Sequence, residues 1–250
     1  MSDIITERSG NILSIQLNRP AKKNAMTSSM YVTMADLLNG AAKDDQIRVV
    51  LWHAAGSSFS AGNDIEDFLQ NPPGQGESPQ AQLMHALINF EKPLIAAVQG
   101  AAVGGGTTML AHCDFVYAGE SAKFQLPFVN LALVPEFGSS YLLPLRFGYT
   151  RAAELILLGG AFDATRAAEL GLVTRVVPDQ SLLATATETA SALAARPPAA
   201  VQACKRLMKR PLREQLDQAV KLELEAFAER VRSDEAKQAF AAFFTRRQPA

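Results

Sequence analysis

The sequence predicts an α/β fold with a mostly parallel sheet, followed by a helical tail. Short apolar segments with strand character alternate with segments of helical periodicity, a run of glycines follows one apolar segment, and the last part of the chain is almost wholly helical in pattern. In folds of this kind ligands bind where parallel strands end. The glycine run at 104–106 therefore marks the expected site.

Strands are predicted where apolar residues alternate with polar ones or form short unbroken runs. They cover residues 11–17, 47–52, 93–98, 114–118 and 172–177. Helices are predicted where apolar residues recur every three or four positions. They cover residues 28–43, 80–90, 105–112 and 211–231, with a short further helix after Asp64. Residues 71–79 (NPPGQGESP) are dense in Pro and Gly and predict a loop that flanks a site entrance.

Composition excludes several classes of function. The 250 residues carry a formal net charge of −1, so no basic field favours nucleic acid or an anionic membrane surface, and an anionic ligand must be held by local lysines and arginines. Cys113 and Cys204 form neither a CxxC pair nor a cluster with histidine, so we expect no disulfide framework and no metal site. The N-terminus lacks the apolar segment of a signal peptide, and no apolar run has membrane-spanning length. A cytoplasmic protein is expected.

Two loops offer backbone N–H groups to a ligand oxygen. One is the phrase SFSAGND at 58–64, which contains Gly62 and Asn63, and the other is the run at 104–106. Two N–H donors from separate loops can hold the oxygen of a thioester enolate without a charged side chain. Glu136 lies among mostly apolar neighbours and is a candidate base. The pattern indicates an enolate-forming enzyme.

Both features also have purely structural interpretations. The phrase at 58–64 is compatible with an ordinary strand-to-helix loop in which Asp64 caps the helix. Glu136 follows Pro135 and is compatible with a glutamate in the first turn of a helix, where the helix dipole stabilises it. The residues alone leave these alternatives open.

The chain resembles the enoyl-CoA hydratase/isomerase (crotonase) family over nearly its whole length. The resemblance rests on Asn18-Arg19-Pro20 with Asn24-Ala25, SAGND, KPLIAAVQGAAVGGG, Cys113-Asp114, Phe124 with Pro127, and Gly171-Leu172-Val173. It implies a crotonase-like spiral of β-β-α units over residues 1–195, and a helical region over 196–250 for assembly as a homotrimer or a dimer of trimers. It also implies that the N–H groups of Asn63 and Gly105 form the oxyanion hole, and that the substrate is an acyl-CoA thioester.

The residues at the family's acid–base positions decide the expected reaction. Hydratases of the family carry one glutamate two residues after the glycine run and another after the proline of Phe-x-x-Pro; Thr108 and Phe128 stand there in this chain. The segment LALVPEFGSSYLLP is instead similar to that of the peroxisomal Δ3,Δ2-enoyl-CoA isomerases, whose glutamate is the base. The resemblance therefore implies that Glu136 moves the proton without a carboxylate partner, and without a cofactor other than the coenzyme A of the substrate.

The basic residues Arg19, Lys22 and Lys23 are expected to bind the coenzyme A phosphates, because lysines of this loop contact the nucleotide in the family. A solvated charged loop is the alternative. Arg246 and Arg247 are a further candidate pair for a neighbouring subunit's ligand. The other residues of the expected substrate site are Ala61, Gly62, Asp64, Ile65, Gly104 and Phe128. Two other functions stay open: another crotonase-family enzyme, such as a hydratase or lyase that uses a different acid, and a non-catalytic acyl-CoA-binding protein.

Overall fold

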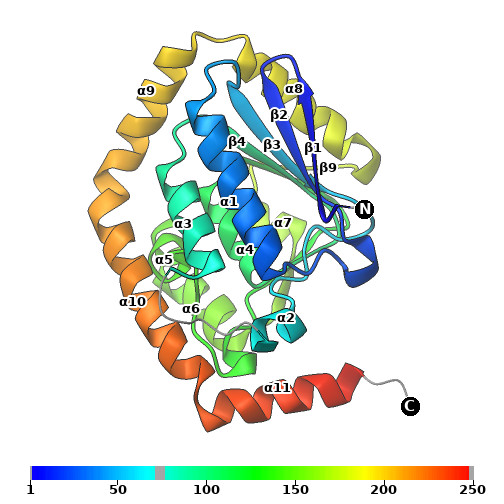
Figure 1. The fold of residues 1–250 in the computed structure, drawn as a ribbon, viewed down its shortest axis with the longest axis vertical. Helices are drawn as coiled ribbons and strands as arrows, with labels where there is room; N and C mark the ends of the chain where they lie inside the picture. Colours follow the sequence, from blue (N-terminus) through cyan, green and yellow to red (C-terminus); the bar gives the residue numbers. More distant parts are fainter. Residues whose placement is uncertain (1, 71–76, 248–250) are drawn as a thin grey trace.

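The computed structural model describes residues 2–70 and 77–247. Figure 1 shows a sheet with α1 (Ser28–Lys43) and α3 (Pro79–Asn89) on one side and α8 (Leu182–Ala194) on the other. Two long helices, α9 (Pro198–Lys209) and α10 (Arg213–Val231), run down one flank, and α11 (Asp234–Arg247) turns back across one end of the molecule. The predicted α/β fold with a helical C-terminal region is confirmed.

The main sheet has the strand order β1-β2-β3-β4-β6-β9. Its strands are β1 (Ile4–Ser9), β2 (Ile12–Leu17), β3 (Val49–Ala54), β4 (Leu94–Val98), β6 (Phe115–Gly119) and β9 (Arg175–Val177). The β1–β2 pair is antiparallel, whereas every pair from β2 to β9 is parallel. The prediction of a mostly parallel core is confirmed. The sequence did not reveal β1, because after the buried Ile4 its residues are exposed and give no alternation.

A second, smaller sheet of three-residue strands was not predicted. It joins β5 (Ala101–Val103), β7 (Lys123–Gln125) and β8 (Ala161–Asp163) in the order β5-β7-β8. Strands this short carry no usable period in the sequence. The sheet fixes the glycine run, because Gly104 directly follows β5 and its N–H donates to Gln125 O at 2.9 Å.

The helices α1 and α3 begin where the sequence supplies a side-chain cap. Thr27 accepts the N–H of Met30 in α1, and Ser78 accepts the N–H of Ala81 in α3. The short helix α2 (Ile65–Gln70) starts after Asp64, as predicted. The predicted helix at 105–112 is instead a short α4 (Gly105–Thr108) continued as the 3-10 helix η2 (Met109–His112). Within the predicted loop at 71–79, residues 71–76 lie outside the described residues, and Pro79 already belongs to α3.

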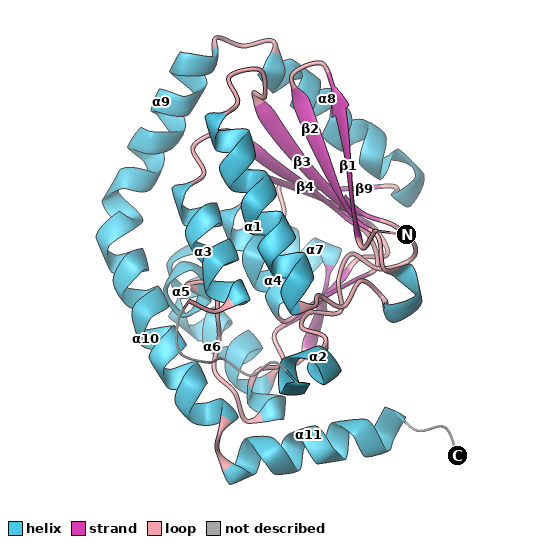
Figure 2. Ribbon diagram, viewed as in Figure 1, coloured by secondary structure: helices cyan, strands magenta, loops and turns pink. Residues whose placement is uncertain are grey.

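The sheet separates two apolar layers. Alternate residues such as Val50 and Trp52 face the large layer with α1 and α3, whereas Val49 and Leu51 face a small layer closed by α8. Three more helices, α5 (Ser139–Phe147), α6 (Tyr149–Leu158) and α7 (Ala164–Glu169), extend the large layer toward the small sheet. Figure 2 shows the strands of the main sheet side by side, with helices around them.

The helix α9 is held to the core by a buried ion pair. Lys205, which is 3% exposed, donates to Asp114 Oδ2 at 2.6 Å and to Lys92 O at 2.7 Å. Asp114 Oδ2 also accepts the N–H of Leu94 at 2.8 Å. A buried charge is tolerated when it is paired and fully hydrogen-bonded. By holding α9 in place, the ion pair also restricts the position of α10 and α11, which follow α9 in the chain.

Candidate active site

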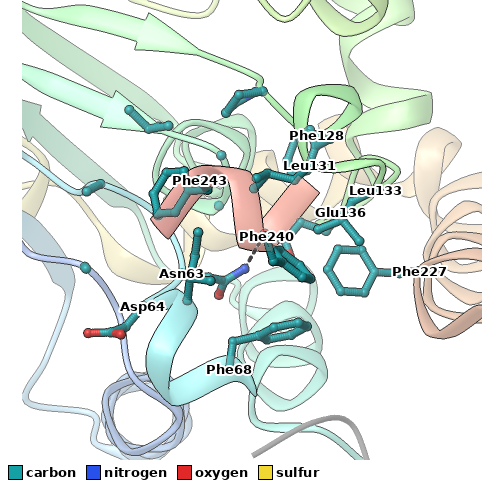
Figure 3. A pocket seen from close by; sticks show the side chains of 18 of the residues that line it. Asn63, Asp64, Phe68, Phe128, Leu131, Leu133, Glu136, Phe227, Phe240 and Phe243 are labelled. Atoms are coloured by element: carbon teal, nitrogen blue, oxygen red, sulfur yellow. Dashed lines mark hydrogen bonds between the residues drawn. The ribbon is translucent and has the colours of Figure 1, made fainter. Parts of the chain in front are cut away.

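One cavity of about 130 Å³ collects most of the predicted site residues. Its walls come from the SAGND loop, the glycine run, the segment around Phe128 and Glu136, and the C-terminal helices α10 and α11 (Figure 3). The predicted residues that line it are Lys22, Ala61, Gly62, Asn63, Asp64, Ile65, Gly104, Gly105, Phe128 and Glu136. Segments far apart in the chain therefore meet at one site.

The SAGND loop is fixed to strand β5. Ser60 N donates to Ala101 O at 3.0 Å, and Val103 N donates back to Ser60 O at 2.9 Å. Gly62 has a φ of +84°, and a Cβ at this position would lie 2.6 Å from Val103 O. Glycine is required here both by the backbone conformation and by the close approach of the two loops. This contact brings Asn63 next to the glycine run.

The two predicted oxyanion donors both line the cavity. Among the described residues we find no hydrogen bond from Asn63 N or from Gly105 N. Gly105 is the first residue of α4, and N–H groups in a first helical turn have no partner within the helix. Two such donors in a cavity are suited to a ligand oxygen that develops negative charge.

Glu136 lies in a sharply turned segment just before α5. The residues that follow it, Phe137 and Gly138, have φ values of +63° and +67°, and the imidazole of His112 contacts Phe137 O at 2.7 Å. The helix starts at Ser139, so Glu136 precedes the helix rather than occupying its first turn. The interpretation of Glu136 as a first-turn glutamate is wrong for this reason. Left-handed non-glycine residues are uncommon and concentrate at functional sites.

The carboxyl group of Glu136 is buried, with 4% of the residue exposed. Its pKa is raised from the ordinary value of 4.5 to about 8, chiefly by burial and in addition by the nearby Glu223, while a hydrogen bond from Asn63 acts in the opposite direction. In that hydrogen bond Asn63 Nδ2 donates to Glu136 Oε1 at 3.4 Å (Figure 3). A carboxyl group with a pKa near neutrality is suited to both accepting and returning a proton.

A second buried carboxyl group, that of Glu223, lies near Glu136 and was not predicted. Glu223 of α10 is 6% exposed and lines a small second cavity together with Glu136. Its oxygens accept the N–H groups of Gly138 and Ser140, each at 2.7 Å, so Glu223 caps the segment that carries Glu136. The sequence around Glu136 does not indicate this contact, because Glu223 belongs to α10, far from Glu136 along the chain.

The residues predicted to bind the coenzyme A phosphates differ in their position relative to the cavity. Lys22 lines the cavity, whereas Arg19 and Lys23 are not among the described residues that do. Arg19 Nη1 instead donates to Asp64 Oδ2 at 2.6 Å and to Ala25 O at 3.0 Å. Burial raises the pKa of Asp64, but hydrogen bonds from Arg19 and from the N–H groups of Asp67 and Glu66 outweigh this and lower it. The side chains of Arg246 and Arg247 lie outside the described residues.

Thr108 and Phe128 occupy the positions at which the resemblance places the hydratase glutamates. Thr108 is fully buried and its hydroxyl donates to Gly104 O at 3.3 Å. Phe128 is 5% exposed and lines the cavity. Neither side chain can exchange a proton at neutral pH.

An aromatic wall completes the cavity and was not predicted. Phe68 of α2 meets Phe227 of α10 edge to face, with ring centroids 5.9 Å apart, and lies 6.4 Å from the ring of Phe240 of α11. Figure 3 shows these three rings around the cavity with Phe243. The residues lie on three separate helices, so no local pattern in the sequence could join them. The wall makes the cavity suited to an apolar chain.

Within residues 2–70 and 77–247 no group of three or more His, Cys, Asp or Glu side chains is placed to hold a metal ion. Over the same residues, no helix combines the length and the apolar character needed to cross a lipid bilayer.

Comparison with known proteins identifies a family and several relatives that this chain resembles. Residues 7–250 match the family model described as enoyl-CoA hydratase/isomerase. The enoyl-CoA hydratase EchA19 of Mycobacterium tuberculosis is 36% identical over 99% of this chain and 95% of its own length. Human enoyl-CoA delta isomerase 2 is also 36% identical, over 98% of this chain, which spans 63% of the human protein. A crystal structure of an enoyl-CoA hydratase/isomerase from Pseudoalteromonas atlantica matches with a TM-score of 0.95 and 40% identity, covering 100% of this chain and 99% of that one.

Proposed function

This chain belongs to the enoyl-CoA hydratase/isomerase family, whose members act on acyl-CoA thioesters, and we propose that it is a Δ3,Δ2-enoyl-CoA isomerase. Glu136 is the base, the backbone N–H groups of Asn63 and Gly105 hold the thioester oxygen, and the aromatic wall receives the acyl chain. The single observation that carries the proposal is the buried carboxyl of Glu136, whose pKa is about 8, in the same cavity as two backbone N–H groups that donate to no other described residue.

The reaction needs one proton acceptor and no external reactant. Glu136 removes a proton from C2 of a 3-enoyl-CoA, and the electron pair spreads over the thioester carbonyl and the C3–C4 double bond as a dienolate. The two N–H groups stabilise the negative oxygen. The same carboxyl group returns the proton to C4, which leaves the double bond between C2 and C3. No metal or redox cofactor is required in this scheme.

Hydratase activity is the second candidate, and the buried carboxylate of Glu223 beside Glu136 favours it. A hydratase needs one group to orient and activate water and another to exchange a proton with the substrate. Both oxygens of Glu223, however, already accept backbone N–H groups. Phe128 also brings a ring rather than a carboxylate to the cavity. These contacts favour the isomerase.

The two activities are separated by assaying one preparation with a 3-enoyl-CoA and with crotonyl-CoA. We expect isomerisation, followed by the absorbance of the conjugated product, and hydration that is far slower. Glu136→Gln keeps the size of the side chain but removes the proton acceptor, so turnover should fall by at least about 100-fold while acyl-CoA binding is retained. Comparable hydration of crotonyl-CoA would replace the isomerase with the hydratase. Binding without any turnover in the wild type would identify an acyl-CoA-binding protein.

We also propose that the chain assembles as a homotrimer or a dimer of trimers, as the family resemblance implies. Several large apolar side chains of α5 and α6 are exposed in the single chain, among them Leu145, Tyr149, Leu157 and Leu158. Apolar patches of this kind support association between subunits. Light scattering of the purified protein measures the mass directly.

A further inference from the structure

Tyr31 lies behind the cavity and is fully buried, although it has a polar end. It belongs to α1, and its ring packs 6.4 Å from the ring of Phe137, the residue that follows Glu136. Its hydroxyl is 2.7 Å from Asn63 Oδ1. A buried phenol in an apolar layer needs such a partner. Tyr31 thus joins α1 to the loop that supplies an oxyanion donor.

The direction of these hydrogen bonds is fixed by chemistry. An amide oxygen only accepts, so the phenol of Tyr31 must donate to Asn63 Oδ1. The other end of the amide, Nδ2, then donates to Glu136 Oε1. With the amide reversed, Asn63 Oδ1 would face the carboxylate oxygen, and two acceptors would meet. An ionised Glu136 therefore requires the orientation with Nδ2 toward it, and the hydrogen bond that Tyr31 donates to Asn63 Oδ1 holds the amide in that orientation.

Gly105 packs against the side chains of both Glu136 and Tyr31. A Cβ at Gly105 would lie 2.9 Å from Glu136 Oε1 and 3.0 Å from Tyr31 Oη. The carboxyl group of Glu136, the hydroxyl of Tyr31 and the backbone of Gly105 are therefore closely packed together. A change at Tyr31 Oη is transmitted to the other two groups with little room for relaxation.

We propose that Tyr31 is a positioning residue of the active site, which holds the Asn63 amide so that Asn63 Nδ2 stabilises the ionised Glu136 carboxylate next to the oxyanion hole. This inference rests on the proposed function, because it assigns Glu136 as the base. It adds a residue that acts through Asn63 and that need not touch the substrate.

The charges around the group agree with this role. Burial and the nearby Glu136 raise the pKa of Tyr31 well above its ordinary value, so the phenol keeps its proton at working pH and remains a donor. Among the described residues, the other titratable group that shifts the pKa of Glu136 is Glu223 of α10, which raises it, while the hydrogen bond from Asn63 lowers it. Without the Tyr31 hydroxyl, the Asn63 amide is free to turn, and the pKa of Glu136 should rise.

The test compares Tyr31→Phe with Tyr117→Phe. Tyr117 is a matched control, because it is also buried and its hydroxyl contacts Thr189 at 2.7 Å, but it packs in the small apolar layer with α8. The carboxyl titration of Glu136 is followed by NMR in protein with labelled glutamate and assigned with Glu136→Gln. Tyr31→Phe should raise this pKa by roughly one unit, and Tyr117→Phe should leave it unchanged.

Activity gives the second readout. Tyr31→Phe and Asn63→Ala should each reduce kcat/KM for a 3-enoyl-CoA at pH 7 by roughly tenfold, and the double variant should be no slower than Asn63→Ala, since Tyr31 acts through that amide. An unchanged Glu136 titration in Tyr31→Phe, or losses that multiply in the double variant, would overturn the inference. A wild type without isomerase activity would refute the proposed function instead, and the titration would still decide the role of Tyr31.

Discussion

The buried carboxyl groups of Glu136 and Glu223 lie close enough for one to raise the pKa of the other. Glu223 keeps its place because Gly138 N and Ser140 N both donate to it. The C-terminal helix α10 therefore does two things at the active site. It fixes the segment that carries the base, and its charge adds to the burial that makes the base a weaker acid.

The pH dependence of the reaction follows from this environment. The base must be ionised to accept a proton, and the pKa of Glu136 is about 8. We expect kcat/KM to rise by about tenfold per pH unit below pH 8 and to level off above it. Glu223→Gln removes the neighbouring charge and should move the rise to lower pH, although it also weakens the capping of α5. A profile that is flat between pH 6 and pH 9 would contradict the assignment of Glu136.

Glu136 should also make the fold less stable as the pH rises. In the unfolded chain its carboxyl ionises near pH 4.5, whereas in the folded protein it holds its proton up to about pH 8. Stability from this group is complete below pH 4.5 and is lost as the pH rises toward 8, by on the order of 4 kcal/mol. Glu136→Gln should therefore be more stable than wild type at pH 8 and equal to it near pH 4. Urea unfolding at the two pH values measures this difference. A Glu136→Gln variant that is less stable than the wild type at pH 8 would contradict the raised pKa of Glu136.

The sequence predicted the long elements of the fold well, and the reason is periodicity. The helix predicted at 28–43 matches α1 (Ser28–Lys43), because its apolar stripe and its Thr27 cap are both local signals. The strand predicted at 47–52 is displaced by two residues from β3 (Val49–Ala54), because a wholly buried strand has no alternation to mark its ends. The three-residue strands of the small sheet were missed, since pairing with distant strands, rather than their own sequence, creates them.

The site was predictable as far as its motifs are local. Gly62, Asn63, Gly105 and Glu136 stand in phrases that could be recognised, and they meet in one cavity. Tyr31, Phe68, Glu223 and Phe227 reach the site from helices whose own patterns describe only packing or solvent exposure. Asn63 was predicted to act through its backbone, whereas its side chain also contacts Glu136. Contacts of this kind depend on the fold and have no signature in the chain.

Substitution of Gly105 should separate catalysis from folding. Gly105→Ala pushes a Cβ against Glu136 and Tyr31, and Gly105→Pro also removes the N–H donor. We expect a loss in kcat of roughly tenfold for alanine and of about 100-fold or more for proline, the size found when one oxyanion donor is lost. Gly40→Ala in α1, where a Cβ would meet open space, is the control and should leave kcat unchanged. A proline variant with near-normal kcat would show that the oxygen is held by other donors.

Lys22 and Lys23 should differ in their effect on substrate affinity. Lys22 lines the cavity, whereas Lys23 follows it as the left-handed residue that ends η1 (Pro20–Lys22). Lys22→Ala should raise KM for acyl-CoA several-fold with kcat unchanged, and the difference should shrink at high salt because an exposed charge pair is screened. Lys23→Ala is the matched control. Equal KM values for the wild type and Lys22→Ala at low salt would assign the phosphates to other cations.

Phe227 should limit the length of the acyl chain. Its ring lines both the active-site cavity of about 130 Å³ and the neighbouring cavity of about 40 Å³, and it meets Phe68, which also lines both, edge to face. Phe227→Leu removes part of this contact, so kcat/KM across a series of 3-enoyl-CoA substrates should shift toward longer chains. The substitution should cost about 1 kcal/mol of folding stability, as is usual when a buried side chain is reduced. Phe162→Leu is the matched control, since Phe162 is similarly buried and stacks on Phe124 in the small sheet, with ring centroids 5.6 Å apart. If both variants keep the wild-type chain-length preference, the acyl chain does not extend past Phe227, and other residues of the cavity, such as Phe128, must set the preference.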